Sequence, residues 1–418
     1  MTILGPVLII LLLLGAPLFA VIAAGALFNF QQADIDLQAF AIEFYGIAEM
    51  PILLAIPLFT FAGYLLSESN APKRIVRLTS ALLGWMPAGL AIVSLVACAF
   101  FTAFTGASGV TIIALGAILF PAMAQAGYPE KFNLGLVTSA GSLGLLFAPS
   151  LPLILYGVVA EVPIEQLFLA GLIPGFLMLL VLSAYSVWKN RAIRTPLGDF
   201  SWLEVRSALR ESMWEIPLPI VVLGGIYSGY FAISEAAAVT ALYVLIVDVL
   251  ILKEVSFRKL PAIVRESMVL VGGIMMILGV SRASTNFMID AGVPQQLLQW
   301  VSGFVTGEVA FMVMLLVFLL ILGAILDIFS AVVLVVPLIL PVATQFGVNP
   351  VHLGIVFLAT MQLGYITPPV GLNLFIAGYR FDRPIVNVYL STLPFFFLLL
   401  LSVMLIAFWP ALSLWLVG

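Results

Sequence analysis

Long stretches without a charged side chain alternate along the sequence with short polar segments. A helix that crosses the roughly 30 Å hydrocarbon core of a membrane needs about 20 apolar residues, and stretches of this length recur throughout the chain. The pattern predicts membrane-spanning helices at 3–28, 47–68, 131–158, 165–188, 215–232, 234–252, 265–288, 351–379 and 387–416. No basic residue precedes the first stretch, so we interpret 3–28 as a span rather than a cleaved signal peptide.

Two charge-free stretches, 78–129 and 328–379, are too long for a single crossing. Gly, Ser, Thr and Pro interrupt both of them, and such residues favour breaks in a helix. We predict that each contributes to a re-entrant hairpin that enters and leaves the membrane on one side. The inner hairpin covers 88–126 and the outer hairpin covers 308–344, and the spans that follow them, 131–158 and 351–379, are interrupted helices.

The basic residues indicate the orientation of the chain. With a cytoplasmic N-terminus and two re-entrant hairpins, every Lys and Arg except Arg282 lies on the cytoplasmic side, as the positive-inside rule requires. This assignment places the C-terminus in the periplasm. We expect Arg282 to reach the outer membrane interface or to pair with Asp290.

The two halves of the chain repeat one another. Helix-breaking residues recur at matching positions, which are Pro121 and Pro341, Gly144 and Gly364, and Pro149 and Pro369. Amphipathic surface helices are predicted at the matching ranges 71–85 and 291–305. We divide the chain into a first repeat, a cytoplasmic linker, an inverting span and a second repeat, at 1–190, 191–214, 215–233 and 234–418. Each repeat alone has four crossings, an even number that would leave the second copy parallel to the first. The additional span at 215–232 makes the number five and inverts the second copy. Inverted repeats with interrupted helices are typical of secondary transporters.

The composition of the 418-residue chain supports this fold class, an all-α polytopic membrane protein. Apolar residues make up 63% of the chain and charged residues only 9%, with a mean hydropathy of +1.24, whereas soluble domains are about one quarter charged. These values exclude a disordered chain and a nucleic-acid-binding protein. A single cysteine, Cys98, and a single histidine, His352, exclude a disulfide framework and a Cys/His metal cluster.

The hairpin tips and the helix breaks are the candidate binding segments. The tips lie at 105–109 and 327–330, and the breaks at 139–152 and 362–373. Backbone carbonyls that are freed from a helix suit a hard cation such as Na⁺, and the N-terminal end of a half-helix favours a carboxylate. Asp327 is the one acidic residue in the two long apolar regions. It either binds a cation, exchanges a proton or caps the second arm of the outer hairpin.

Several of these segments resemble a known family. FTGASGVTIIALG (104–116), AGSLGLLFAPSLPLILYG (140–157), LDIFSAVVLVVPLILP (326–341) and LGYITPPVGLNLF (363–375) are similar, in this order, to the large membrane subunit of tripartite ATP-independent periplasmic (TRAP) transporters. The resemblance covers nearly the whole chain. It implies an elevator-type, Na⁺-coupled importer of organic acids in the bacterial inner membrane. It also implies a small transmembrane subunit and a periplasmic substrate-binding protein as partners.

The resemblance also implies the site residues. Na⁺ is expected at Gly106, Ser108, Ser142 and Gly144 in the first repeat, and at Asp327, Ser330, Thr367 and Pro368 in the second. The organic acid is expected near Thr105, Ser150, Gly364 and Asn373. The outer tip departs from the family, because Ile328 follows the aspartate where many relatives carry a proline.

Other functions remain open from the sequence. A stand-alone organic-anion symporter or antiporter of a related fold, coupled to Na⁺ or H⁺, would carry the same repeats and need no binding protein. An intramembrane enzyme is disfavoured, because the chain offers no convincing nucleophile–base pair or metal cluster, and a channel is disfavoured by the absence of charged rings. C4-dicarboxylates, sialic acid, other sugar acids and keto acids all stay possible as substrates.

Overall fold

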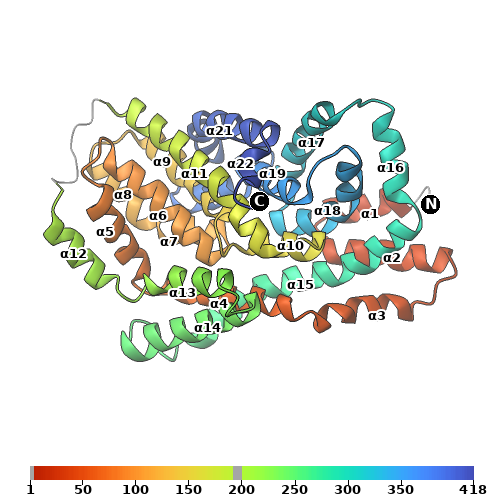
Figure 1. Ribbon diagram of the computed structural model, residues 1–418, viewed down its shortest axis with the longest axis horizontal. Helices are drawn as coiled ribbons and strands as arrows, with labels where there is room; N and C mark the ends of the chain where they lie inside the picture. The colour runs from red at the N-terminus through yellow and green to blue at the C-terminus, as the bar shows by residue number, and fades with distance from the viewer. Residues whose placement is uncertain (1–3, 192–199) are drawn as a thin grey trace.

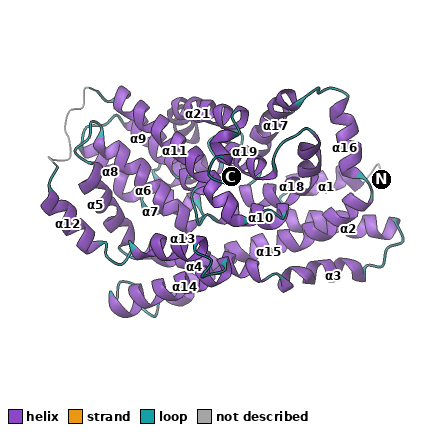
Figure 2. Cartoon of the chain, in the orientation of Figure 1, coloured by secondary structure: helices purple, strands orange, loops and turns teal. Residues whose placement is uncertain are grey.

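The computed structural model describes residues 4–191 and 200–418, and all regular structure in these ranges is helical (Figure 2). Six helices are long and apolar enough to cross a membrane: Pro51–Glu68, Ile164–Lys189, Ile233–Ile251, Leu260–Asp290, Ile328–Gln345 and Ile385–Phe408. Two further pairs qualify if each bent pair is one span, namely Ser108–Ala114 with Gly116–Gln125, bent by 48°, and Glu130–Leu146 with Leu151–Ala160, bent by 43°. The protein is therefore a polytopic membrane protein.

One set of helices runs along a long edge of the molecule (Figure 1). We call it the scaffold layer, and it contains α2 (Leu18–Gln32), α3 (Gln38–Gly46), α4 (Ala55–Glu68), α13 (Pro217–Tyr227), α14 (Ile233–Leu245) and α15 (Leu260–Asp290). Helix α4 packs against α14 and α15, and α15 also packs against α2 and α3. The 31-residue α15 thus connects the parts of this layer.

The remaining large helices form a second layer, which we call the hairpin layer. From the first repeat it takes α6 (Gly89–Thr105), α7 (Ser108–Ala114), α8 (Gly116–Gln125), α9 (Glu130–Ala140), α10 (Leu151–Ala160) and α11 (Ile164–Lys189). From the second it takes α17 (Glu308–Gly323), α18 (Ile328–Gln345), α19 (Pro350–Gly364), α20 (Leu372–Arg380) and α21 (Ile385–Phe408). In Figure 1 the two hairpins lie on opposite sides of α11, α19 and α21.

The two repeats interlock in the hairpin layer. The inner hairpin is α6 with α7 and α8, and its second arm packs through α7 against α20 of the second repeat. The outer hairpin is α17 with α18, and its second arm packs against α10 of the first repeat. Each hairpin therefore rests on the half-helix that follows the break of the other repeat.

The N-terminal segment differs from its prediction. The expected single span at 3–28 consists, in its described part, of α1 (Leu4–Leu13) and α2, separated by a turn with Gly15 at φ +93° and by Pro17. Leu8 of α1 lies against Gly25 of α2, so the two helices fold back on one another. The turn contains no charged residue, which is why the charge-free stretch looked continuous.

The same arrangement opens the second repeat and corrects the count of its elements. The predicted span at 215–232 contains only the 11-residue α13, followed by a turn with Gly229 at φ +73° and then by α14. Helix α13 thus corresponds to α1 and is not an additional element. A pair such as α1 with α2 returns the chain to the side of the membrane from which it started, so it does not change which side comes next. The first repeat then crosses the membrane through α4, the α9–α10 pair and α11. This odd number of crossings places the start of the second repeat on the opposite side, so the second repeat is still predicted to be inverted.

Two surface helices match the predicted arms: α5 (Ala71–Leu83) and α16 (Val293–Ser302). Arg74 of α5 is buried, at 7% exposed, and forms ion pairs with Glu215 at 2.6 Å and with Glu254. Burial alone would raise the pKa of the Glu254 carboxyl. Hydrogen bonds from Arg74 and from the Asn70 N–H have the larger combined effect, so the pKa of Glu254 is lowered overall. Burial lowers the pKa of Arg74, and its two acidic partners more than reverse this effect. These contacts fix α5 to the scaffold layer.

The predicted linker at 191–214 is helical in part. Residues 192–199 lie outside the described residues, and α12 (Trp202–Glu211) follows them. Arg77 of α5 pairs with Glu204 at 3.1 Å and with Glu211 of this helix, so α12 packs on the inner arm.

Candidate functional site at the hairpin tips and helix breaks

The inner tip lies between α6 and α7. Gly106 ends α6 at φ +64°, and its N–H donates to Thr102 O at 2.8 Å. Glycine is favoured here because a side chain is strained at positive φ. A Cβ on Gly106 would also lie 2.5 Å from the Leu151 side chain. The tip therefore rests directly on the start of α10.

The first break packs against the same hairpin. Helix α9 ends at Ala140, a short 3₁₀ turn follows at Leu143–Leu146, and α10 begins at Leu151. The Thr102 hydroxyl donates to Gly141 O at 2.9 Å. A Cβ on Gly144 would lie 2.2 Å from Ala99 O, so this glycine allows the turn to approach α6. The structure thus brings the expected residues Gly106 and Gly144 to the contact between tip and break.

Three hydroxyl oxygens around this contact are buried and have no hydrogen-bond partner among the described residues. They belong to Thr105 at the tip, Ser139 at the end of α9 and Ser150 before α10, and all three residues are 0% exposed. A buried polar group without a partner costs about 1–3 kcal/mol. Each of these hydroxyls therefore favours a ligand that supplies the missing interaction.

The outer tip satisfies its own polar groups. The Asp327 carboxylate accepts hydrogen bonds from the N–H groups of Phe329 and Ser330, both at 3.0 Å, and from the Ser330 hydroxyl. Asp327 is the N-cap of α18 and is exposed. The structure therefore shows capping, one of the roles considered for Asp327, while its role in cation binding stays a prediction.

The second break packs against the end of α17. The N–H groups of Val370 and Gly371 donate to Ala324 O at 3.1 and 3.3 Å. The Thr367 hydroxyl donates to Leu363 O at 2.9 Å, and Pro368 is exposed. A Cβ on Gly364 would lie 2.3 Å from Gly323 C, so Gly364 serves close helix contact in this structure.

The inner tip also contacts the second repeat. The Ser108 hydroxyl donates to Asn373 Oδ1 at 2.8 Å, and Asn373 Nδ2 donates to Thr138 O at 3.3 Å. Ser142 lies in the first break, where its hydroxyl is 3.5 Å from Ser139 O. Ser139 begins the candidate segment 139–152 but was not named as a ligand, and the Thr138 carbonyl was missed, although the hydroxyl-rich run at 138–142 was a usable signal.

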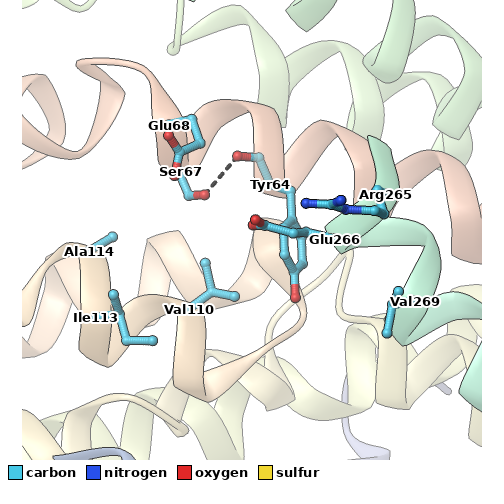
Figure 3. Close-up of a pocket in the computed structure, with 9 residues that line it drawn as sticks. All are labelled: Tyr64, Ser67, Glu68, Val110, Ile113, Ala114, Arg265, Glu266 and Val269. Atoms are coloured by element: carbon cyan, nitrogen blue, oxygen red, sulfur yellow. Dashed lines mark hydrogen bonds between the residues drawn. The ribbon is translucent and has the colours of Figure 1, made fainter. Parts of the chain in front are cut away.

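Two crevices separate the layers at opposite ends of α15. The larger has a volume of about 520 Å³ and is lined from α4, α7 and α15 by Tyr64, Ser67, Glu68, Val110, Ile113, Ala114, Arg265, Glu266 and Val269 (Figure 3). In Figure 3 the Arg265 and Glu266 side chains lie near Tyr64, and the α7 side chains form an apolar wall. The crevice thus lies between a polar surface of the scaffold layer and the second arm of the inner hairpin.

The smaller crevice, of about 220 Å³, lies between the C-terminal part of α15 and the second arm of the outer hairpin. Arg282 and Glu161 line it together with Val333 of α18. Arg282 forms an ion pair with Glu43 of α3 at 3.2 Å. The expected pairing with Asp290 is therefore wrong, because α3 presents a carboxylate beside Arg282 in the C-terminal part of α15.

This architecture defines a membrane transport protein, since interrupted helices and hairpin tips meet at buried polar groups that have no partner among the described residues. A family model described as "Tripartite ATP-independent periplasmic transporter, DctM component" matches residues 6–412. The chain belongs to this family, and it is the large permease component of a bacterial TRAP transporter. This confirms the resemblance and the expectation that the chain is not an enzyme.

Individual relatives support the assignment. The chain is 32% identical to the C4-dicarboxylate TRAP transporter large permease protein of Pseudomonas aeruginosa, covering 94% of this chain and 92% of the relative. It is 33% identical to the isethionate TRAP transporter permease protein DctMQ of Oleidesulfovibrio alaskensis, covering 96% of this chain and 62% of the relative. The crystal structure of the YdaH transporter from Alcanivorax borkumensis has a TM-score of 0.58 at 13% identity, covering 89% of this chain and 87% of that one. This last similarity supports the fold.

Proposed function

We propose that this permease imports small organic acids together with Na⁺, and that its hairpin layer moves against its scaffold layer in an elevator-type cycle. The observation that carries the proposal is that three hydroxyls of the inner tip and the first break, those of Thr105, Ser139 and Ser150, are buried and have no partner among the described residues. Hydroxyl and carbonyl oxygens are the ligands that hard cations prefer. A bound Na⁺ would replace the missing partners and add the positive charge that an organic anion needs. This proposal assigns the Thr105 and Ser150 hydroxyls, which the sequence placed near the organic acid, to the cation as well.

The substrate class follows from the half-helices and from the relatives. Ser150 lies at the N-terminal end of α10, where the helix dipole favours an anionic group. Relatives are named as transporters of C4-dicarboxylates, isethionate, 2,3-diketo-L-gulonate and ectoine, and each of these compounds carries a carboxylate or a sulfonate. We assign the same chemical class, an organic anion of this size, to this chain.

The two layers support the proposed motion. The crevices at both ends of α15 lie between scaffold helices and the second arms of the hairpins. A displacement of the hairpin layer along α15 would close one crevice and open the other. Loading with both ions lowers the cost of this displacement, because either ion alone leaves an uncompensated charge in a medium of low dielectric constant.

The proposal includes two partners and a location. A small transmembrane subunit would brace the scaffold layer, and a periplasmic substrate-binding protein would deliver the anion. The isethionate permease protein DctMQ is longer than this chain, which covers 62% of it. Its additional length supports the proposal that this chain works with a second membrane component. The permease would lie in the inner membrane, with its C-terminus in the periplasm. Because the α1–α2 pair leaves the parity of crossings unchanged, the start of α1 would lie on the same side, which differs from the cytoplasmic N-terminus expected from the sequence.

The test is uptake of labelled organic acids into proteoliposomes that contain this chain and its small subunit. Uptake is measured with an inward Na⁺ gradient, and with and without the cognate binding protein. We expect uptake to need both. Uptake without the binding protein would show a stand-alone symporter instead, and uptake driven by a proton gradient alone would overturn Na⁺ coupling.

A further inference from the structure

Asn373 occupies an unusual place for an amide side chain. It is 0% exposed, in the second residue of α20, and it lies where three segments of the hairpin layer meet. Its Oδ1 accepts from the Ser108 hydroxyl at the inner tip, and its Nδ2 donates to Thr138 O at the end of α9. Its backbone N–H donates to Tyr365 O in the second break at 3.0 Å. One residue thus connects the inner tip and the first break to the second break.

The matching position in the other repeat shows that packing alone does not require this polar bridge. The repeat spacing that relates Pro149 to Pro369 relates Asn373 to Leu153 and Ser108 to Ile328. Leu153 and Ile328 are buried, at 0% and 1% exposed, and helices α10 and α18 pack together. The matching positions at the outer tip and in the first repeat's half-helix therefore hold two buried apolar side chains, whereas the inner tip and α20 hold a buried hydroxyl and a buried amide. Burying polar groups carries a cost that an apolar pair avoids.

The direction of the hydrogen bond between Ser108 and Asn373 has a chemical consequence. The Ser108 hydroxyl hydrogen points to Asn373, so the lone pairs of its oxygen face away from the amide. A hydroxyl oxygen held in this way is ready to bind a cation at the inner tip. The second hydrogen bond, to Thr138 O, fixes the amide plane, so that Asn373 holds the Ser108 hydroxyl in one orientation.

We propose that Asn373 is a positioning residue that couples ion binding at the inner tip to the backbone of the second break, so that Na⁺ binds to the two regions cooperatively. This inference rests on the proposed Na⁺ coupling and deepens it. A cation on the Ser108 oxygen strengthens the hydrogen bond to Asn373 and holds the start of α20. The start of α20 in turn holds the freed segment between Gly364 and Leu372, whose carbonyls are the other candidate ligands. By linkage, a cation at the second break tightens the inner tip equally.

The experiment measures Na⁺ binding without transport. The purified full chain is titrated with NaCl at constant ionic strength, and its melting temperature is followed, because a ligand that binds the folded state raises it. The variants are Asn373→Ala, Ser108→Ala, the double variant and Ser108→Thr, which keeps the hydroxyl. Asn133→Ala is the matched control, since Asn133 is also 0% exposed but donates to Tyr128 O within the first repeat.

We expect a Hill coefficient for Na⁺ of roughly 2 in the wild type, which falls to about 1 in Asn373→Ala and in Ser108→Ala, because the coefficient reports coupling between sites. The double variant should behave like either single variant, and Ser108→Thr should restore cooperativity. Asn133→Ala should lower the melting temperature but keep the Hill coefficient of the wild type.

The outcomes separate the two proposals. A wild type that does not respond to Na⁺ overturns the proposed Na⁺ coupling and this inference with it. A wild type that responds without cooperativity, or a cooperativity that survives in Asn373→Ala, overturns the role of Asn373 alone. If Asn373→Ala does not fold, Asn373→Leu, which carries the residue found at the matching position of the other repeat, tests the same bridge.

Discussion

The inner and outer tips occupy matching positions in the two repeats but treat their polar groups differently. The inner tip is buried and rests on α10, and the Thr105 hydroxyl at the tip has no partner among the described residues. The outer tip has an exposed aspartate that caps its own helix. Within the described ranges, both adjoining breaks contain buried polar atoms without a partner, on Ser139 and Ser150 in the first and on Gln362 in the second, so the difference lies in the tips themselves.

The surface arms show the same contrast. Arg74 joins α5 to Glu215 and Glu254 through buried ion pairs. In the described part of α16 and its surroundings no ion pair of this kind occurs, and the Gln296 side chain makes one long hydrogen bond, to Ala291 O at 3.5 Å. The inner arm is thus fixed to the scaffold layer by charge, and the outer arm depends on packing against α15 and α18. The two surface arms, α5 and α16, should therefore respond very differently to substitution.

The largest effect is expected when the inner arm loses its charge. Arg74→Gln leaves Glu215 and Glu254 without their cation, and removing one partner of a buried pair costs about 3–5 kcal/mol. The measurement is the free energy of unfolding in detergent. Arg282→Gln is the matched control, because its pair with Glu43 is about one third exposed and such pairs contribute about 0–1 kcal/mol. Equal losses in the two variants would contradict the contrast between the arms.

The loss of folding stability in Arg74→Gln should depend on pH. The net pKa of Glu254 is lowered below its usual 4.5, so this carboxylate stabilises the wild type above that value. The contribution disappears as the pH falls through the lowered pKa. The difference in stability between the wild type and Arg74→Gln should therefore be largest near neutral pH and shrink in acid, which thermal unfolding across a pH series would show.

A smaller effect, on Na⁺ affinity rather than stability, is expected at the inner tip. Ser150 makes no side-chain hydrogen bond as the N-cap of α10, so Ser150→Ala removes no existing interaction and should not lower stability without Na⁺. It removes a candidate ligand for a charged partner, which contributes about 1.5–3 kcal/mol. Half-saturation by Na⁺ should therefore rise by roughly tenfold or more. An unchanged Na⁺ titration would exclude Ser150 from the cation site.

The smallest effect on stability is expected at the outer tip. Asp327→Asn keeps a good N-cap, because Asn and Asp cap helices about equally well, but it removes the negative charge. We expect unfolding to change by only a few tenths of a kcal/mol, while the Na⁺ dependence of uptake weakens. Unchanged Na⁺ dependence would show that Asp327 only caps α18, and Asp327→Ala would then report the full value of the cap.

Much of the fold could be predicted because helix-breaking residues mark it in the sequence. Gly106, Pro149 and Pro369 lie in the tip and the breaks where the structure interrupts its helices. The turn at Gly15 and Pro17 carried the same signal, but it lies inside a charge-free stretch, and the lack of charge masked it. Breaks are local properties of the backbone, and they can therefore be inferred from a few neighbouring residues.

Contacts between distant segments could not be predicted in this way. Arg74 finds Glu215 and Glu254 at separations of 141 and 180 residues, and nothing near Arg74 distinguishes it from the exposed Lys73. The contact of α7 with α20 likewise depends on how the repeats interlock. No local pattern pairs Ser108 with Asn373, although both were predicted as candidate site residues from the sequence.

The interlocking of the repeats has a consequence for synthesis of the protein. Ser108 and Asn373 are 265 residues apart, so at ordinary elongation rates of about 5–20 residues per second the inner tip waits tens of seconds for its partner. During that time the first repeat is already in the membrane with the polar groups at its tip uncovered. The nascent chain therefore passes through a vulnerable interval that ends only when the last quarter of the protein has been inserted.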